Sequence, residues 1–130
     1  MITEDFCSFE VAKLLKEKGF DAECRAAYTN YGKLFTTQIQ QYVTNVLCSK
    51  GYLWDCVAPT HQMAMKWLRG KGIFIQIGIV GHSTITIPED YYFFKVYRDR
   101  KFISHEKTET YHTYEDAVEA ACIYSLKNLI

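Results

Sequence analysis

The sequence predicts an α+β fold in which a small antiparallel β-meander of three to five strands packs against about three helices. Two observations lead to this class. Apolar residues recur at helical spacing in three separate segments, and each segment is bounded by capping residues. Between the second and the third, β-branched and aromatic residues form short runs divided by turn residues, which is typical of antiparallel strands.

The first predicted helix lies in SFEVAKLLKEKGF, residues 8–20. Ser8 can cap the first turn, because its hydroxyl can accept a hydrogen bond from a free backbone N–H. Gly19 can end the helix, since glycine tolerates the left-handed conformation found just after many helices. The apolar residues between these two signals follow helical spacing, so the segment predicts an amphipathic helix.

The segment from residue 28 to residue 55 is less decisive. Thr29, Asn30 and Gly32 supply the chemistry of a turn, so a short strand is expected on either side of them. The following stretch, TTQIQQYVTNVLCSKGYLW, fits both a helix and a strand, because its apolar residues match both periodicities. The two alternatives stay open at this stage.

The second predicted helix lies in APTHQMAMKWLRG, residues 58–70. Pro59 fits the first helical turn, and Met63, Trp67 and Leu68 recur at helical spacing before Gly70. The third predicted helix begins after Thr113, which can cap it, and its apolar stripe continues to the last residue.

Strands are predicted between these two helices. The runs are IFIQIGIV, STITI, YYFFKVYR and KFIS, and the turns between them fall at residues 81–83, 88–90 and 99–101. Consecutive runs joined by short turns favour a meander in which each strand pairs with the next.

Composition narrows the possible classes of protein. The 130 residues fit one globular domain spanning 1–130, and 15 basic residues against 15 acidic ones leave no overall field that attracts nucleic acid or lipid. No run is long and apolar enough to cross a bilayer, and the acidic start is unlike a secretory signal. Five cysteines, an odd number, are expected to be reduced thiols in the cytoplasm.

Signatures of catalysis are weak. No CxxC spacing and no phosphate-binding glycine motif occurs, so we expect no metal and no cofactor. Cys56 and His61, with Asp55 beside them, form the one local cluster that could act as a thiol nucleophile and base. Because the same residues flank the start of a helix, where they are expected anyway, a thiol-dependent enzyme is the weakest hypothesis.

The run YYFFKVYRDRKF, residues 91–102, interleaves aromatic and basic side chains. On a strand, residues 91, 93, 95 and 97 share one face and residues 92, 94, 96 and 98 share the other, so one set should face solvent. The candidate binding residues are Tyr91, Tyr92, Lys95, Tyr97, Arg98, Arg100 and Lys101.

Two functions follow from this candidate surface. The leading hypothesis is a non-enzymatic protein-interaction module that associates with a protein partner or with itself as a homodimer. The alternative is binding of single-stranded nucleic acid, in which the aromatic rings stack on bases and the basic groups contact phosphates.

Several segments resemble a family of short proteins of unknown function from gut bacteria and their phages or mobile elements. The matching residues are Ala58-Pro59-Thr60, Gln62-Met63-Ala64, Trp67-Leu68-Arg69, Tyr111, Thr113-Tyr114-Glu115 and Ala117-Val118-Glu119-Ala120-Ala121, and the opening helix is similar too. The resemblance implies an intact fold and a mobile-element origin. It implies no activity.

Overall fold

The computed structural model describes residues 4–36, 42–48, 54–80, 91–103 and 109–130. Within these ranges it has an α+β fold, as predicted. The helices are α1 (Phe9–Glu17), α2 (Asn45–Cys48), α3 (His61–Gly70) and α4 (Tyr114–Asn128). The strands are β1 (Ala26–Thr29), β2 (Leu34–Thr36), β3 (Trp54–Val57), β4 (Ile73–Val80), β5 (Tyr91–Arg98) and β6 (Lys101–Ile103).

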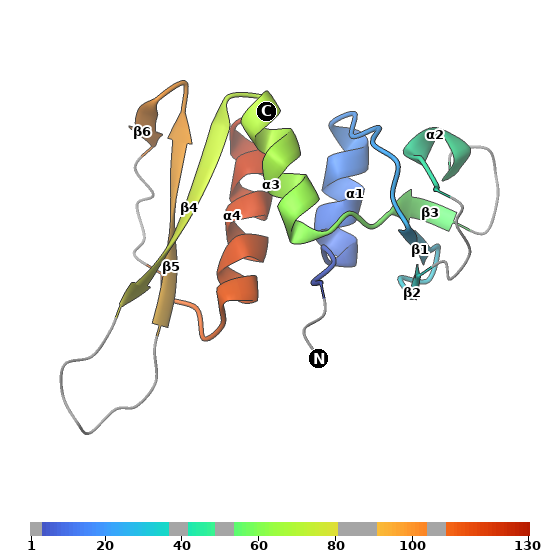
Figure 1. Ribbon diagram of the computed structural model, residues 1–130, viewed down its shortest axis with the longest axis horizontal. Helices are drawn as coiled ribbons and strands as arrows, with labels where there is room; N and C mark the ends of the chain where they lie inside the picture. Colours follow the sequence, from blue (N-terminus) through green and yellow to red (C-terminus); the bar gives the residue numbers. More distant parts are fainter. Residues whose placement is uncertain (1–3, 37–41, 49–53, 81–90, 104–108) are drawn as a thin grey trace.

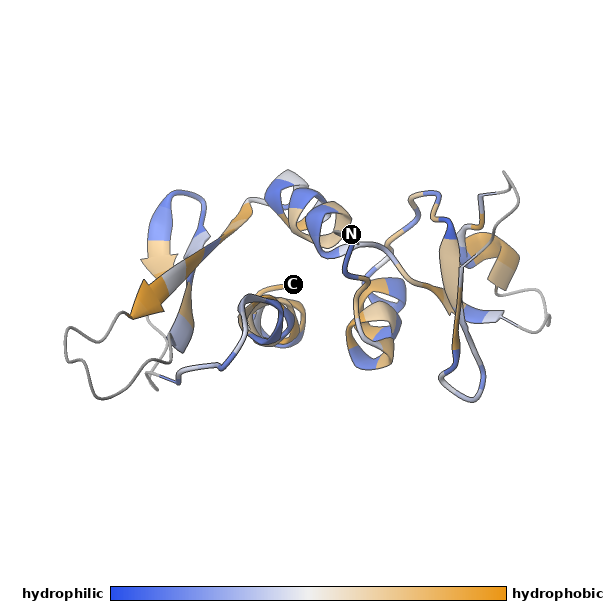
Figure 2. Cartoon of the chain, turned by 60° about the horizontal axis from the view of Figure 1, so that its bottom comes forward, coloured by the Kyte–Doolittle hydropathy of each residue, from blue (hydrophilic) through white to orange (hydrophobic). Residues whose placement is uncertain are grey.

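The described strands form two antiparallel sheets, of which the second is a three-stranded meander, as predicted, and the first is a separate sheet that the sequence did not indicate. One sheet has the order β2-β1-β3 and the other β4-β5-β6. The sheets lie at opposite ends of an elongated molecule, and α1, α3 and α4 lie between them (Figures 1 and 2). The ambiguous segment contains α2 and ends at the first residue of β3, which pairs with β1 to complete the first sheet.

The three longer helices begin where capping residues predict. The side chains of Ser8, Thr60 and Thr113 each accept a hydrogen bond from the backbone N–H three residues later. In α3, one expectation was wrong. Pro59 precedes the helix and is not part of its first turn, because Thr60 is the capping residue.

In the second sheet, β4 and β5 are direct neighbours, although a strand at STITI was expected between them. β4 pairs directly with β5 along all eight residues, from Ile73 opposite Arg98 to Val80 opposite Tyr91. The predicted STITI strand and the turns at 81–83 and 88–90 lie outside the described residues. The third predicted turn is present, and Asp99 and Arg100 adopt positive φ there, as the tight connection from β5 to β6 requires.

One large apolar cluster connects the two ends of the molecule. It contains buried residues from α1, α3 and α4 together with Val57 of β3 and Ile73, Phe94 and Val96 of the second sheet. All five cysteines are buried and none forms a disulfide. Among the described residues, no helix combines the length and apolar character that crossing a membrane requires.

Candidate functional site

The outer side of the sheet β4-β5-β6 carries an aromatic surface. Phe94 and Val96 of β5 are buried against the helices, so the alternate residues of β5 point away from them. Antiparallel register places the matching residues of β4 and β6 on the same side. We call this surface the outer aromatic face; it consists of Phe74, Gln76, Gly78, Val80, Tyr91, Phe93, Lys95, Tyr97 and Phe102.

Three aromatic rings form a row across this face. Tyr97 of the middle strand β5 lies opposite Phe74 of β4 on one side and Phe102 of β6 on the other. The rings of Tyr97 and Phe102 meet edge to face, with centroids 5.6 Å apart. Phe74 and Phe102 are 45% and 55% exposed, values that leave large apolar side chains open to solvent.

Gly78 makes room for another ring of the outer aromatic face. It lies opposite Phe93 in the β4–β5 pair, and a Cβ atom at position 78 would lie only 2.2 Å from the ring of Phe93. The ring therefore lies over the glycine backbone, an arrangement that no other residue type at this position permits without movement.

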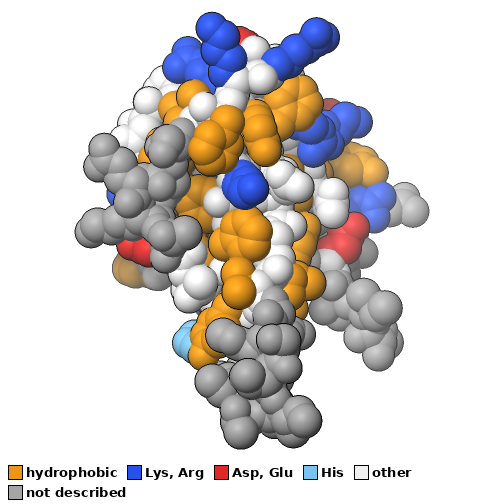
Figure 3. Space-filling model, turned by 90° about the vertical axis from the view of Figure 1, so that its left-hand side faces the viewer, with side chains coloured by type: hydrophobic (Ala, Val, Ile, Leu, Met, Phe, Trp, Pro, Cys, Tyr) orange, Lys and Arg blue, Asp and Glu red, His pale blue; other side chains and the backbone are white. Residues whose placement is uncertain are grey.

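One basic side chain, that of Lys95, belongs to the outer aromatic face, whereas Arg98 and Lys101 lie opposite each other with the register of the inner side, at the end of the sheet. Lys95 is exposed in the middle of β5, and its Nζ lies 5.8 Å from the centroid of the Phe93 ring. Arg98, Arg100 and Lys101 are exposed where β5 turns into β6. Figure 3 shows hydrophobic side chains across this side of the molecule, with basic side chains among them and at one end.

The structure separates the predicted binding residues. Tyr91, Lys95 and Tyr97 belong to the outer aromatic face. Tyr92 does not: it shares the inner side with Phe94, forms a two-residue bridge with Tyr111, and packs its ring against that of Tyr114 with centroids 6.2 Å apart. Sequence reasoning missed Phe74, because only the β4–β5 pairing brings this residue beside the predicted run.

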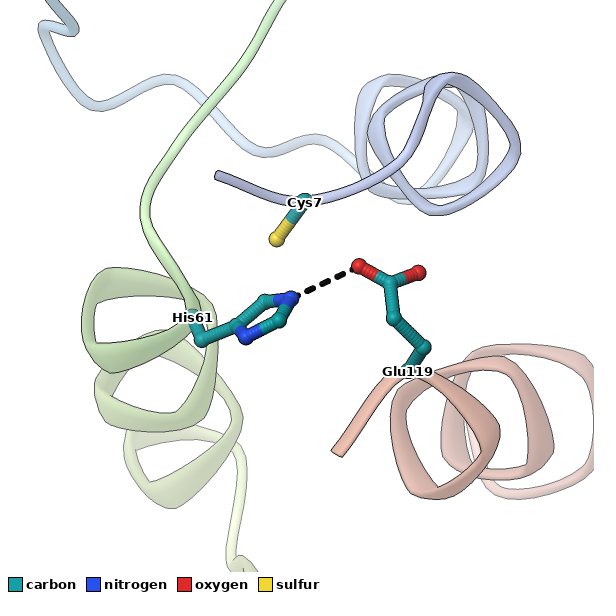
Figure 4. A group of neighbouring side chains, drawn as sticks. All are labelled: Cys7, His61 and Glu119. Atoms are coloured by element: carbon teal, nitrogen blue, oxygen red, sulfur yellow. Dashed lines mark hydrogen bonds and ion pairs between the residues drawn. The ribbon is translucent and has the colours of Figure 1, made fainter. Parts of the chain in front are cut away.

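A second candidate site lies in the interior, where three chemically active side chains meet. The sulfur of Cys7, a ring nitrogen of His61 and a carboxylate oxygen of Glu119 all lie within 4.8 Å of one another (Figure 4). The chain around Phe6 pairs with Thr60, which brings Cys7 beside the start of α3. Packing of α4 against α1 adds Glu119.

Glu119 binds the starts of two helices. Its Oε1 accepts hydrogen bonds from the Ser8 backbone N–H at 2.8 Å and from Nε2 of His61 at 2.7 Å, and its Oε2 accepts one from the Ser8 hydroxyl at 2.6 Å. Burial raises the pKa of Glu119, but the hydrogen bonds from His61 and Ser8 outweigh it and leave the pKa below its ordinary value. The positive ends of the α1 and α3 dipoles favour the same ionised form.

Cys7 and His61 do not have the geometry of a catalytic dyad. An ionised carboxylate only accepts hydrogen bonds, so the proton of the Glu119–His61 bond belongs to Nε2. Figure 4 shows that the other ring nitrogen points away from the sulfur of Cys7, so no basic nitrogen faces the thiol. The thiol is fully buried, burial raises its pKa, and it donates instead to the Thr60 carbonyl oxygen at 3.8 Å.

The predicted pair Cys56 and His61 is placed in two different environments. Cys56 is buried on β3 in a small apolar cluster with Ala12, Tyr28 and others, and burial raises the pKa of its thiol to about 12. His61 instead forms a hydrogen bond with Glu119. Within the described part of the chain, no hydrogen bond joins His61 to Cys56. Sequence spacing gave no signal for the Cys7–His61–Glu119 cluster, because its members are more than fifty positions apart.

Comparisons with protein-family models, with curated proteins and with solved structures find no match to this chain.

Proposed function

We propose that this protein is a small non-enzymatic binding module whose outer aromatic face binds single-stranded nucleic acid. The observation that carries this proposal is the row of Phe74, Tyr97 and Phe102 on three adjacent strands, with the exposed Lys95 on the middle strand.

The row of rings suits stacking on bases. Neighbouring strands hold their side chains about 4.8 Å apart, so the sheet supports the rings at a fixed spacing without further ordering of the backbone. Stacking of one base on one aromatic side chain contributes about 1–3 kcal/mol and tolerates any base, because every base has a π face. Exposed Phe74 and Phe102 offer such faces or edges at both sides of Tyr97.

The charge of this region suits phosphates. The strands β4, β5 and β6 contain no Asp or Glu, whereas they contain Lys95, Arg98 and Lys101, and Arg100 lies in the turn beside the single acid Asp99. The whole chain has no net charge, so basic groups are concentrated here relative to the rest. Basic groups next to stacking rings are the combination by which single strands are bound without reading their sequence.

A protein partner is the second candidate function, and exposed Val80 favours it. Aliphatic side chains do not stack on bases, but together with aromatic ones they form the centre of many protein interfaces. Self-association through this face is less favourable, because a two-fold contact centred on the middle strand would bring Lys95 of both copies together.

The test is titration of fluorescently labelled single-stranded DNA and RNA, with duplexes of the same sequences, followed by anisotropy at several salt concentrations. We expect single strands to bind more tightly than duplexes and binding to weaken steeply with salt. Combined replacement of Phe74 and Phe102 by Ala should weaken binding of single strands at least tenfold. Lys95→Ala should weaken this binding too and should make the affinity less dependent on salt.

Two variants at the opposite end of the molecule are matched controls. Tyr31 is 94% exposed and Lys33 is exposed, and both lie in the connection between β1 and β2. Tyr31→Ala and Lys33→Ala should leave binding unchanged. Absence of single-strand binding at low salt, or an equal loss of affinity in the test and control variants, would exclude this function. Light scattering would then measure self-association, and affinity capture from nuclease-treated lysate would identify protein partners.

A further inference from the structure

We propose that Cys7, His61 and Glu119 form a binding site for one zinc ion, independently of the outer aromatic face. Three donor atoms of different chemistry lie within 4.8 Å of one another in the interior of the protein. They come from three separate parts of the chain: the residue before the capping position of α1, the first residue of α3, and the middle of α4.

The donor set selects the metal. A thiolate, an imidazole and a carboxylate are the three kinds of ligand that zinc accepts, and mixed sulfur, nitrogen and oxygen donors do not suit calcium or magnesium. Three protein ligands leave one position of a tetrahedral zinc free for water. A cleft of about 190 Å³ lies next to the start of α3 and is lined in part by His61, although not by Cys7 or Glu119.

The present spacing is close to what zinc requires. Zinc–nitrogen and zinc–oxygen bonds of about 2.0–2.1 Å in a tetrahedron place the two ligand atoms about 3.3 Å apart. Nε2 of His61 and Oε1 of Glu119 are 2.7 Å apart, so a bound ion needs them to separate by roughly half an ångström. The sulfur of Cys7 lies within 4.8 Å of both atoms, and a tetrahedral ion with a zinc–sulfur bond of about 2.3 Å would hold it about 3.6 Å from each, so it moves inward by up to about 1 Å.

Neighbouring hydrogen bonds hold two ligands in position. The Ser8 backbone N–H and hydroxyl both donate to the carboxylate of Glu119, a type of support that ligating carboxylates commonly have. The backbone of Cys7 is fixed on both sides: its N–H donates to the Pro59 carbonyl oxygen at 2.8 Å, and its carbonyl oxygen accepts from the Tyr28 hydroxyl at 2.6 Å. The site therefore needs little ordering before an ion binds.

Zinc binding changes the protonation of Cys7 and His61. The thiol of Cys7 must lose its proton to solvent, so one proton is released for each ion bound. The Nε2 proton of His61 must leave that nitrogen, and the ring stays neutral by carrying its proton on Nδ1 instead. The Glu119–His61 hydrogen bond is replaced by two bonds to the metal.

The experiment is a titration of the reduced, metal-free full chain with Zn²⁺ in competition with a chromophoric chelator, and with Co²⁺ monitored by absorbance. We expect one equivalent of zinc and, with Co²⁺, the intense thiolate-to-metal absorption band of a sulfur-ligated ion. Cys7→Ser should abolish that band and weaken zinc binding at least tenfold. Glu119→Gln should weaken zinc binding but keep the band.

The matched control is Cys56→Ser, which removes a buried thiol outside the cluster and should leave stoichiometry and band unchanged. Circular dichroism of each variant checks that it folds. The titration of the unaltered chain decides the matter even if a variant fails to fold. Failure of that chain to bind one equivalent, or a band that survives Cys7→Ser and disappears with Cys56→Ser, would overturn the proposal and leave the cluster as a hydrogen-bonded network only.

Discussion

Glu119 is a partly buried residue that connects three helices through hydrogen bonds. Its two carboxylate oxygens accept three hydrogen bonds from Ser8 and His61, and these connect α4 to the starts of α1 and α3. A partly buried carboxylate is stable only when such donors replace water. The residue therefore serves the packing of three helices whether or not it also binds a metal.

This role predicts the effect of Glu119→Gln in a buffer that contains a chelator. The amide has one acceptor oxygen in place of two, so at least one of the three hydrogen bonds is lost, and we expect the free energy of unfolding to fall by about 1–3 kcal/mol. Urea denaturation measures the change. Glu115→Gln, an exposed replacement on the same helix, should stay within about 0.5 kcal/mol of the unaltered protein; a similar change in both variants would contradict the role.

At the scale of single elements, local signals predicted helices well. Ser8, Thr60 and Thr113 each bond to a backbone N–H only three positions away, so the information lies within one turn of the chain. Strand pairing was predicted less well. The sequence was interpreted as placing the STITI run between β4 and β5, but these two strands pair directly with each other, because strand pairing depends on contacts between distant segments and not on local propensity.

The contact between β4 and β5 at Gly78 predicts an unusual sensitivity. Alanine normally suits a strand at least as well as glycine, but here its Cβ would overlap the Phe93 ring, and we expect Gly78→Ala to reduce the free energy of unfolding by about 1–3 kcal/mol. Thermal or chemical denaturation measures it.

Gly70→Ala is the control for this prediction. Gly70 ends α3, and nothing lies within 4 Å of a Cβ built there. Its replacement should leave stability unchanged or raise it by up to about 1 kcal/mol, because alanine favours helix. A Gly78→Ala variant as stable as the unaltered protein would show that the Phe93 ring moves away without cost.

At the scale of the whole molecule, one core connects the two sheets. Val57 of β3 and Val96 of β5 belong to the same apolar cluster although their sheets lie at opposite ends of the structure (Figure 1). Figure 2 shows the helices that occupy the space between them. A shared core of this kind makes the two ends depend on each other for stability.

This arrangement predicts one cooperative unfolding transition. Tryptophan fluorescence, which reports on Trp54 of β3 and Trp67 of α3, should coincide with circular dichroism. Val57→Ala and Val96→Ala should each reduce the free energy of unfolding of the whole protein by about 1–3 kcal/mol, because each leaves a cavity in the common core. Val46→Ala, at a side chain that is 61% exposed, should have little effect. Two separate transitions would mean that the sheets unfold independently.

The sequence by itself determined the α+β class, the three longer helices, the strands from residue 73 to 80 and from 91 to 103, and the alternation that gives β5 an aromatic, basic side. These features depend on spacing and capping over a few residues. Tertiary structure alone decided that the described strands form two sheets, that Phe74 completes the aromatic row, that Tyr92 faces inward, and that Cys7, His61 and Glu119 meet. Each of these requires contacts between segments far apart in the chain, and the free energy that selects them comes from burial of a shared core, which local patterns do not record.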